Sequence, residues 1–175
     1  MNYFLEEVKD GKYRRGEEWL PFKVREEVIK VKDSEPVVVR CYENVHGVLE
    51  GEPSEDGYYL CLAISHRDAG ALTFEEFSRH YRSHTVGESM DHLSRCDALS
   101  FNWGLADSAG NIGYQMSGCC PIKPEGWSGV LPLPGWDESC DWKGFHPPEK
   151  NPRLLNPEQG YFGTSNQDLN HLTDV

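Results

Sequence analysis

Hydrophobic and polar residues alternate along residues 28–33 (VIKVKD), which places Ile29 and Val31 on one face. A period of two predicts a half-buried strand. After a short turn, residues 36–42 (PVVVRCY) are predicted to return as its partner strand. Residues 58–65 (YYLCLAIS) are mostly apolar, which predicts a further, buried strand.

Two helical patterns follow, each opening with the Thr-x-x-Glu signature of a capping box, at residues 73–76 and 85–88. Apolar residues then repeat at helical spacing. These stripes are predicted to pack in the core and contain Phe74, Phe77 and Tyr81 in the first helix and Val86, Met90, Leu93 and Cys96 in the second.

Residues 100–118 (SFNWGLADSAGNIGYQMSG) contain two apolar runs around a short polar connector. This pattern predicts a β-hairpin in which Gly110 takes a positive φ. Asp107 is expected to accept hydrogen bonds from backbone N–H groups of the turn. The other distinctive side chains of the hairpin are interpreted as scaffold: Asn102, Trp103, Asn111 and Tyr114.

Residues 119–160 hold eight of the eleven prolines, together with Trp127, Trp136 and Trp142. Proline at this density excludes a regular helix or sheet, while the aromatic residues can attach the segment to a folded surface. We therefore predict a long ordered loop, followed by a short strand at residues 160–166.

Composition narrows the classes of partner. A chain of 175 residues predicts a single domain over residues 1–175. The net charge of −12 disfavours nucleic acid and anionic lipid as partners.

No apolar run reaches 18 residues, so no membrane span is expected, and residues 1–20 show no signal-peptide pattern. Six cysteines occur without a C-x-x-C pair, which favours reduced, partly buried thiols over a zinc ribbon and leaves disulfides open.

Several motifs occur together in a fixed order. They are REEVIKVKD (25–33), NVHGV (44–48), FNWGLADSAGNIGYQMSG (101–118), LPLPGWDESCDWKGF (131–145) and NPRLLNPEQGYFGTSNQ (151–167). Each is weak alone, but the series resembles the penicillin acylase family of N-terminal-nucleophile hydrolases over residues 2 to 167. Asn44 stands where a Thr is common in the family.

The resemblance implies an α+β fold, mainly antiparallel with one helical pair, as part of an αββα body. It implies hydrolysis of linear amides by acyl transfer to an N-terminal Ser, which autoproteolysis exposes and whose α-amine acts as base. That Ser would lie upstream of this chain, so the chain alone is expected to be inactive. Its partners would be a small-molecule amide substrate and the remaining acylase segments. The alternative is a non-catalytic module that keeps the scaffold and binds a ligand or a partner chain. Cellular location is not indicated, although relatives are often exported.

The resemblance also implies site residues. Asn166 maps to the side-chain amide that donates to the oxyanion, with the register open by one position because Gln167 follows it. A turn or capping role for Asn166 is the alternative. Phe101 maps to a position that lines the acyl pocket, and core packing is an equally good interpretation.

Family members often bind calcium, and the resemblance maps one ligand to Asn2 and another near Met1. Asn2 lacks the charge of a carboxylate and the other ligands would lie outside this chain, so no metal and no other cofactor are expected. His46 is interpreted as structural, because the α-amine serves as base. His80 and His84 are four residues apart but have no third ligand at suitable spacing, which favours a solvated face. No G-x-S-x-G elbow occurs, which excludes an α/β-hydrolase.

Overall fold

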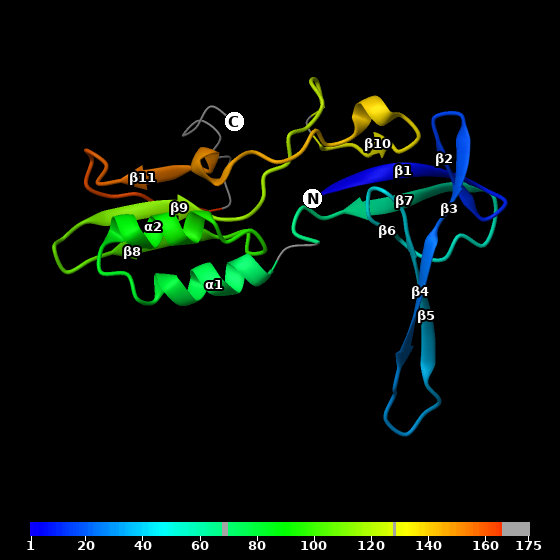
Figure 1. Ribbon diagram of the computed structural model, residues 1–175, viewed down its shortest axis with the longest axis horizontal. Coiled ribbons are helices and arrows are strands. Elements are labelled where there is room, and N and C mark those ends of the chain that lie inside the picture. Colours follow the sequence, from blue (N-terminus) through cyan, green and yellow to red (C-terminus); the bar gives the residue numbers. More distant parts are fainter. Residues whose placement is uncertain (68–69, 128, 166–175) are drawn as a thin grey trace. The chain divides into compact units, whose positions relative to one another are not determined.

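The computed structural model describes residues 1–67, 70–127 and 129–165 of the chain (Figure 1). Antiparallel strands dominate it and are accompanied by α-helices, so the predicted α+β class is confirmed. No helix in this described part has the length and apolar character needed to cross a bilayer. The chain divides into two compact units.

The first unit contains residues 1–64 and 123–143 and is built on one sheet. Its strands are β1 (Asn2–Lys9), β2 (Lys12–Arg15), β3 (Glu18–Pro21), β4 (Lys23–Ile29), β5 (Val37–Glu43), β6 (Val48–Leu49), β7 (Gly57–Ala63) and β10 (Leu133–Pro134). They lie in the order β3-β2-β1-β7-β6-β5-β4 with antiparallel pairing, and β10 joins β1 in parallel.

Strand β1 organises this unit because alternate side chains along it point into the core. Phe4 and Val8 are buried on that face, and so are Asn2 and Glu6. The apolar core around them contains Tyr13, Phe22, Leu49, Cys61, Ala63, Leu133 and Cys140. Strand β7 pairs along the whole of one edge of β1, which leaves the other edge to β2 and β10. Backbone hydrogen bonds therefore attach the proline-rich loop to the centre of the sheet.

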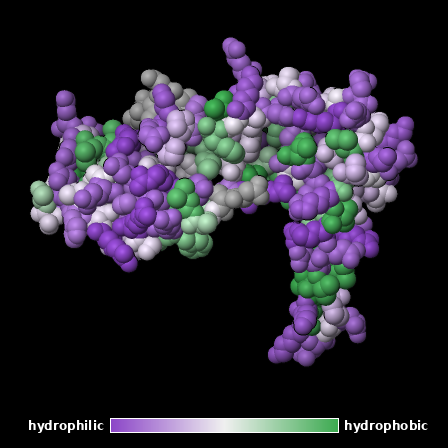
Figure 2. Space-filling view, viewed as in Figure 1, coloured by the Kyte–Doolittle hydropathy of each residue, from purple (hydrophilic) through white to green (hydrophobic). Residues whose placement is uncertain are grey.

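The β4–β5 hairpin is more exposed than the sequence predicts. Strand β4 ends at Ile29 and every residue in it is exposed, so the prediction of a half-buried strand extending to residue 33 is wrong. The antiparallel pairing with β5 is confirmed. Near the turn, Val28 pairs with Val38 and Ile29 with Val37, and successive pairs point to opposite faces of the ribbon. Apolar residues are visible on the side of this hairpin that Figure 2 shows. Alternation predicts the faces of a strand, but it does not tell whether anything covers them.

Strand β7 forms where the apolar run predicts it, but its burial is partial. Tyr58 and Leu60 are exposed, whereas Cys61 and Ala63 are buried. The ring of Tyr58 lies 5.9 Å from that of Trp136 in the proline-rich loop. An aromatic residue of the loop thus contacts the sheet, as the sequence predicts.

The second unit contains residues 65–122 and the chain from Gly144 onward. Its elements are α1 (Ala71–His80), α2 (Val86–Ser94), β8 (Asn102–Ala106), β9 (Ile112–Met116) and β11 (Arg153–Leu155), with strand order β11-β9-β8. Helix α2 packs on β9 at Gly113, where a Cβ atom would lie 2.4 Å from Val86 Cγ1 and 2.7 Å from Met90 Sδ. Glycine at this position allows the close approach of helix and sheet.

The two predicted capping boxes have different outcomes. Helix α2 begins as predicted: Thr85 is its N-cap, and its side chain accepts a hydrogen bond of 3.2 Å from the Glu88 N–H. The α2 stripe is buried as predicted. Helix α1 instead begins after Gly70, and Thr73 lies inside it, where Oγ1 accepts a 2.8 Å hydrogen bond from the Ala98 N–H.

The predicted core stripe of α1 is wrong for Phe74 and Tyr81, which are 79% and 74% exposed. Phe77 is half-buried, and its ring centroid lies 5.7 Å from that of Trp103. The buried face carries Thr73 and Glu76 instead. Polar partners determine this choice: Glu76 pairs with Arg95, at 2.8 Å. A search for apolar spacing overlooks a face that is buried through hydrogen bonds.

The hairpin of residues 100–118 is confirmed, with Gly110 at φ 88°. Asp107 Oδ1 accepts hydrogen bonds of 3.0 Å from the N–H groups of Ala109 and Asn111, as expected. Over its described residues, the proline-rich segment is more regular than predicted. It contains β10, β11 and two 3₁₀ turns, η1 (Glu138–Cys140) and η2 (Pro148–Lys150). The strand predicted at residues 160–166 is wrong over its described part, and the pairing strand is β11.

Candidate functional site

A cavity of about 460 Å³ opens in the second unit, beside the first residue of β8. It is lined by Ser100, Phe101, Asn102, Thr164 and Ser165. The structure therefore brings the sequence-predicted pocket residue Phe101 together with Thr164 and Ser165, which precede Asn166. Asn166 itself lies outside the described residues.

Phe101 is not a core residue, because 54% of it is exposed. Its position is nevertheless well defined. Its backbone N–H donates to Ser117 Oγ at 3.3 Å, and its carbonyl accepts from the Ser117 N–H at 2.9 Å. Its ring meets Trp103 edge-on, with centroids 5.7 Å apart. Phe101 thus presents a positioned apolar surface to the cavity.

Asn102 connects the cavity to the buried side of the hairpin. Its Oδ1 accepts a 2.6 Å hydrogen bond from the Tyr114 hydroxyl, and its Nδ2 donates to Thr164 Oγ1 at 3.1 Å. Tyr114 is buried, and burial raises its pKa to about 12. The phenol therefore keeps its proton and acts as a donor throughout the neutral range.

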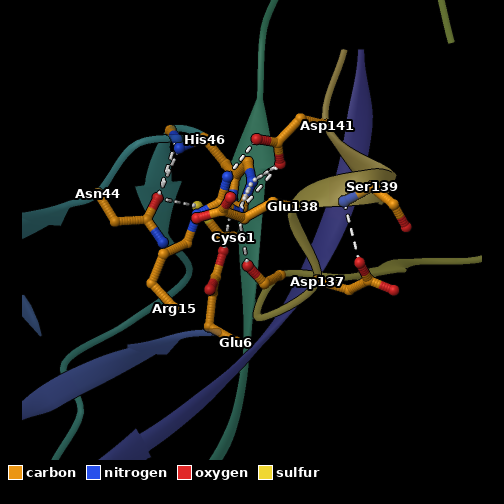
Figure 3. Close-up of polar contacts among 11 residues, drawn as sticks. Glu6, Arg15, Asn44, His46, Cys61, Asp137, Glu138, Ser139 and Asp141 are labelled. Carbon is orange, nitrogen blue, oxygen red and sulfur yellow. Dashed lines mark hydrogen bonds and ion pairs between the residues drawn. The ribbon is translucent and has the colours of Figure 1, made fainter. Parts of the chain in front are cut away.

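A group of charged side chains is enclosed in the first unit and forms the charged quartet: Glu6, Arg15, His46 and Asp141 (Figure 3). His46 Nδ1 lies 2.7 Å from Glu6 Oε1, and its Nε2 lies 2.9 Å from Asp141 Oδ1. Arg15 contacts both oxygens of Asp141. The His46 ring stacks on Phe4 with centroids 3.8 Å apart. The side chains of Glu6, His46 and Arg15 are 0%, 6% and 12% exposed.

The quartet brings two carboxyl groups and two basic side chains together. Each ring nitrogen of His46 faces a carboxyl oxygen, and the Arg15 guanidinium contacts Asp141, so acidic and basic groups alternate in the cluster. Partial burial opposes ionisation of Asp141, but hydrogen bonds from Arg15 and His46 outweigh it and lower the pKa of that carboxyl. The quartet contains no hydroxyl or thiol nucleophile. Because it joins β1, β2, the turn before β6 and the proline-rich loop, this geometry supports the structural interpretation of His46.

Two neighbouring glycines show how tightly this region is packed. A Cβ atom on Gly47 would lie 1.9 Å from the Leu62 carbonyl oxygen, and one on Gly135 would lie 2.3 Å from Glu6 Oε2. Asn44 Oδ1 accepts hydrogen bonds from the N–H groups of His46 and Gly47, at 3.0 and 3.1 Å. Asn44, where the family often has Thr, thus closes the turn that carries His46.

Comparisons with known proteins show the family to which the chain belongs. The family model described as penicillin amidase matches residues 1–174. The chain belongs to the penicillin amidase family. The acyl-homoserine lactone acylase QuiP of Pseudomonas fluorescens is 34% identical over 175 residues, which cover 95% of this chain and 21% of that protein. Penicillin G acylase of Escherichia coli is 30% identical over 167 residues, which cover 93% of this chain and 19% of that protein.

The fold of a penicillin amidase is also seen in the structural comparison. The thermostable penicillin G acylase from Alcaligenes faecalis matches with a TM-score of 0.85 at 22% identity, over 96% of this chain and 31% of that chain. This chain therefore spans about a fifth of the length of the curated relatives described above.

The calcium ligand that the family resemblance maps to Asn2 does not fit a cation in this member. Asn2 is 3% exposed, and its Oδ1 accepts a 3.2 Å hydrogen bond from Trp142 Nε1. Its Nδ2 faces Gly129, at 3.4 Å from the carbonyl oxygen. A Cβ atom built on Gly129 would lie 2.9 Å from Lys123 Nζ, so an ammonium group already lies in this neighbourhood. Trp142 thus uses one lone pair of the Asn2 carbonyl oxygen, and a nearby ammonium group disfavours a second cation.

The fold separates His80 and His84, the possible metal-binding pair that the sequence offers. Helix α1 ends at His80, so His84 lies in the connection to α2, and the two are not on one helical face. Within the described ranges, no group of three His, Cys, Asp or Glu side chains could hold a metal ion. All six cysteines are free, and burial raises the pKa of the Cys96 thiol to about 11.

The sequence reasoning missed the charged quartet and the role of Asn102. Arg15 and Asp141 are 126 residues apart, and no local pattern relates them. One signal was available: Glu6 interrupts the apolar face Phe4-x-x-x-Val8 of a strand, and a carboxylate on that face needs a buried cation. The hairpin pattern indicates only a scaffold role for Asn102 and Tyr114, and the contact of Asn102 with Thr164 depends on the path of the distant C-terminal segment.

Proposed function

We propose that this chain is part of an amide hydrolase and supplies three components to it. These are the β-framework, an apolar wall of the acyl pocket at Phe101, and an oxyanion donor at Asn166. The attacking hydroxyl and the α-amine that serves as its base belong to an N-terminal Ser on a segment upstream of this chain. The isolated chain is therefore not expected to turn over a substrate.

One observation carries the proposal: Phe101 and the residues immediately before Asn166 line the same cavity. These two segments are more than 60 residues apart in the sequence, and the family resemblance assigns one to the acyl pocket and the other to the oxyanion site. Their meeting at one cavity supports both assignments. The relatives support the reaction class, since both QuiP and penicillin G acylase are named as acylases.

The chemistry suits a side-chain amide at position 166. Attack on an amide carbonyl places a negative charge on its oxygen, and a positioned N–H donor stabilises that charge in the transition state. Asparagine donates without carrying a charge of its own. Removal of one such donor typically lowers the rate by about 10²–10³-fold. We accordingly propose an amide substrate with an apolar acyl group.

Two experiments test the proposal. First, the purified chain is assayed with a chromogenic acyl-anilide, and no turnover is expected. Second, this chain replaces the matched segment of Escherichia coli penicillin G acylase, and the chimera is assayed with the same substrate. In the chimera, Asn166→Ala should abolish most activity and Gln167→Ala should not.

Processing of the chimera into its subunits, followed by mass spectrometry, reports on folding independently of turnover. Turnover by the isolated chain that survives Asn166→Ala would refute the proposal. A chain that binds acyl ligands but supports no hydrolysis in a processed chimera would instead favour the non-catalytic module.

A further inference from the structure

Strand β4 is an open edge of the sheet in the first unit. It ends the strand order β3-β2-β1-β7-β6-β5-β4 and pairs only with β5 among the described strands (Figure 1). Every residue from Lys23 to Ile29 is exposed. In an edge strand, alternate residues direct their backbone N–H and C=O groups away from the sheet, where another strand can bond them. No backbone hydrogen bond of the described residues joins another segment to this edge.

This edge lacks the usual protection against strand addition. Native edge strands are commonly blunted by proline, by a bulge or by a covering segment. Strand β4 contains no proline, and it pairs with β5 residue for residue, without a bulge. Its apolar residues Val24 and Val28 are exposed. The edge therefore combines unpaired backbone groups with uncovered apolar side chains, which is the surface that an added strand requires.

The charge of the β4–β5 ribbon differs from that of the whole chain. Residues 23–43 contain five Lys or Arg and five Asp or Glu residues, so their net charge is zero. The chain as a whole carries −12. Two copies of an acidic chain repel each other least where they meet at a neutral surface. The ribbon provides such a surface for a second copy.

The sequence of β4, KVREEVI, is complementary to itself when two copies run antiparallel about a two-fold axis at Glu26. In this register Val24 lies opposite the partner's Val28, and Arg25 lies opposite the partner's Glu27. The symmetry forms each of these pairs twice. An axis moved by one residue, to Arg25 or to Glu27, places a valine opposite Glu26 and loses the Arg25–Glu27 pairs. The side chains therefore select one register.

The charge on the axis is compensated within each copy. Glu26 would face the partner's Glu26, and two like charges directly opposite each other disfavour pairing. Each carboxylate already has a cation beside it, because Arg40 Nε on β5 donates to Glu26 Oε1 at 2.8 Å. The centre of the paired strands would then hold two ion pairs.

We propose that this chain forms a two-fold dimer by antiparallel pairing of β4 with β4 of a second copy. The two ribbons together make one four-stranded sheet in the order β5-β4-β4-β5. The proposal uses no residue of the proposed acylase site, so it is independent of the proposed function.

Charge exchange tests the register, with sedimentation of the chain at micromolar concentration as the readout. Arg25→Glu and Glu27→Arg each place like charges opposite each other and should raise the dimer dissociation constant at least about tenfold. An equimolar mixture of the two variants should associate again, because every Glu of one variant then faces an Arg of the other. Lys150→Glu, an exposed position outside the ribbon, alters the net charge as Arg25→Glu does and should leave dimerisation unchanged. A mixture that stays monomeric would overturn the register.

A disulfide trap tests the two-fold axis. Glu26→Cys places a thiol opposite the same thiol of the second copy, at a separation that a disulfide can span. Mild oxidation should therefore link the copies through position 26, which peptide mass spectrometry identifies. Lys23→Cys is the control, since the two copies of position 23 would lie about 20 Å apart. Both side chains are exposed, so neither variant disturbs the core.

Three results would overturn the proposal. The first is a wild-type chain that stays monomeric throughout the micromolar range. The second is a disulfide that forms as readily through position 23 as through position 26. The third is an edge that exchanges its β4 amide hydrogens rapidly in the isolated chain at every concentration and becomes protected only in the acylase chimera, because the remaining acylase segments would then be its occupant.

Discussion

The guanidinium group of Arg15 contacts both carboxylate oxygens of Asp141, a residue 126 positions later in the chain. This pair fastens the proline-rich loop to strand β2. The Arg15 side chain is only 12% exposed, and Asp141 is its main anionic partner, with Glu138 farther away at 3.7 Å from Nε.

Removing the Arg15–Asp141 ion pair should destabilise the protein. Asp141→Ala leaves a nearly buried cation and should lower the free energy of unfolding by about 2–4 kcal/mol, because a buried charge without its partner is strongly unfavourable. Urea denaturation measures the change. Asp91→Ala is the control, since Asp91 and Arg153 form a 3.4 Å pair with 62% and 39% exposed side chains. That surface pair should contribute less than about 1 kcal/mol. Equal losses in the two variants would contradict the described role of the charged quartet.

Replacing glycine by alanine should lower the free energy of unfolding at position 47 and raise it at position 87. Gly47→Ala should destabilise by about 3 kcal/mol or more, because its methyl group would overlap the backbone oxygen of Leu62, which cannot move freely. Gly87→Ala should stabilise by about 0.5–1 kcal/mol, since Gly87 lies within α2 and a Cβ atom would meet nothing closer than 4.0 Å. Thermal melts of both variants check the prediction, and a neutral Gly47→Ala would show that the turn is loosely packed.

The stabilising contribution of the hydrogen bonds to Asp107 should be lost at low pH. Hydrogen bonds from the Asn111 side chain, followed by backbone N–H groups, hold the pKa of Asp107 below its ordinary 3.8. A lowered pKa means that this contribution to stability is complete above about pH 4 and is lost as the pH falls through the lowered value. A ¹³C NMR titration of the Asp107 carboxyl carbon should give a midpoint below 3.8, and Asn111→Ala should raise it. An unchanged midpoint in the variant would exclude Asn111 as the main cause.

The β4–β5 hairpin should make the isolated chain self-associate. Val28 and Val38 pair on one face and are 62% and 56% exposed. Exposed apolar residues on a two-stranded ribbon favour contact with another surface. Sedimentation at micromolar concentration should detect dimers or larger species, and the Val28→Thr and Val38→Thr double variant should shift them to monomer. Val45→Thr, 60% exposed outside the hairpin, should have no such effect. A monomeric wild-type chain with a sharp, cooperative melt would count against this prediction.

The sequence predicts those features that depend on neighbouring residues. The Thr85 cap, the Gly110 turn and the pairing of β4 with β5 follow from capping, turn and alternation rules, and the structure confirms each. These interactions close within a few residues or across one hairpin, so a local pattern contains the necessary information.

Burial and long-range contacts could not be predicted in the same way. The apolar residues of α1 suggested a buried stripe, yet Glu76 occupies the buried face because Arg95 accompanies it. Family motifs pointed to Phe101 and to the tetrad around Asn166 but gave no indication of the contact between Asn102 and Thr164. Such contacts are determined by the path of the whole chain.

The central claim is that this chain supplies a donor amide to an acyl-transfer site whose nucleophile lies elsewhere. The most direct test is the initial rate of acyl-anilide hydrolysis by the processed acylase chimera with Asn166, with Asn166→Ala and with Gln167→Ala. The account predicts a loss of about 10²–10³-fold for Asn166→Ala alone. Equal rates for the Asn166 and Asn166→Ala proteins, at equal extents of processing, would contradict it.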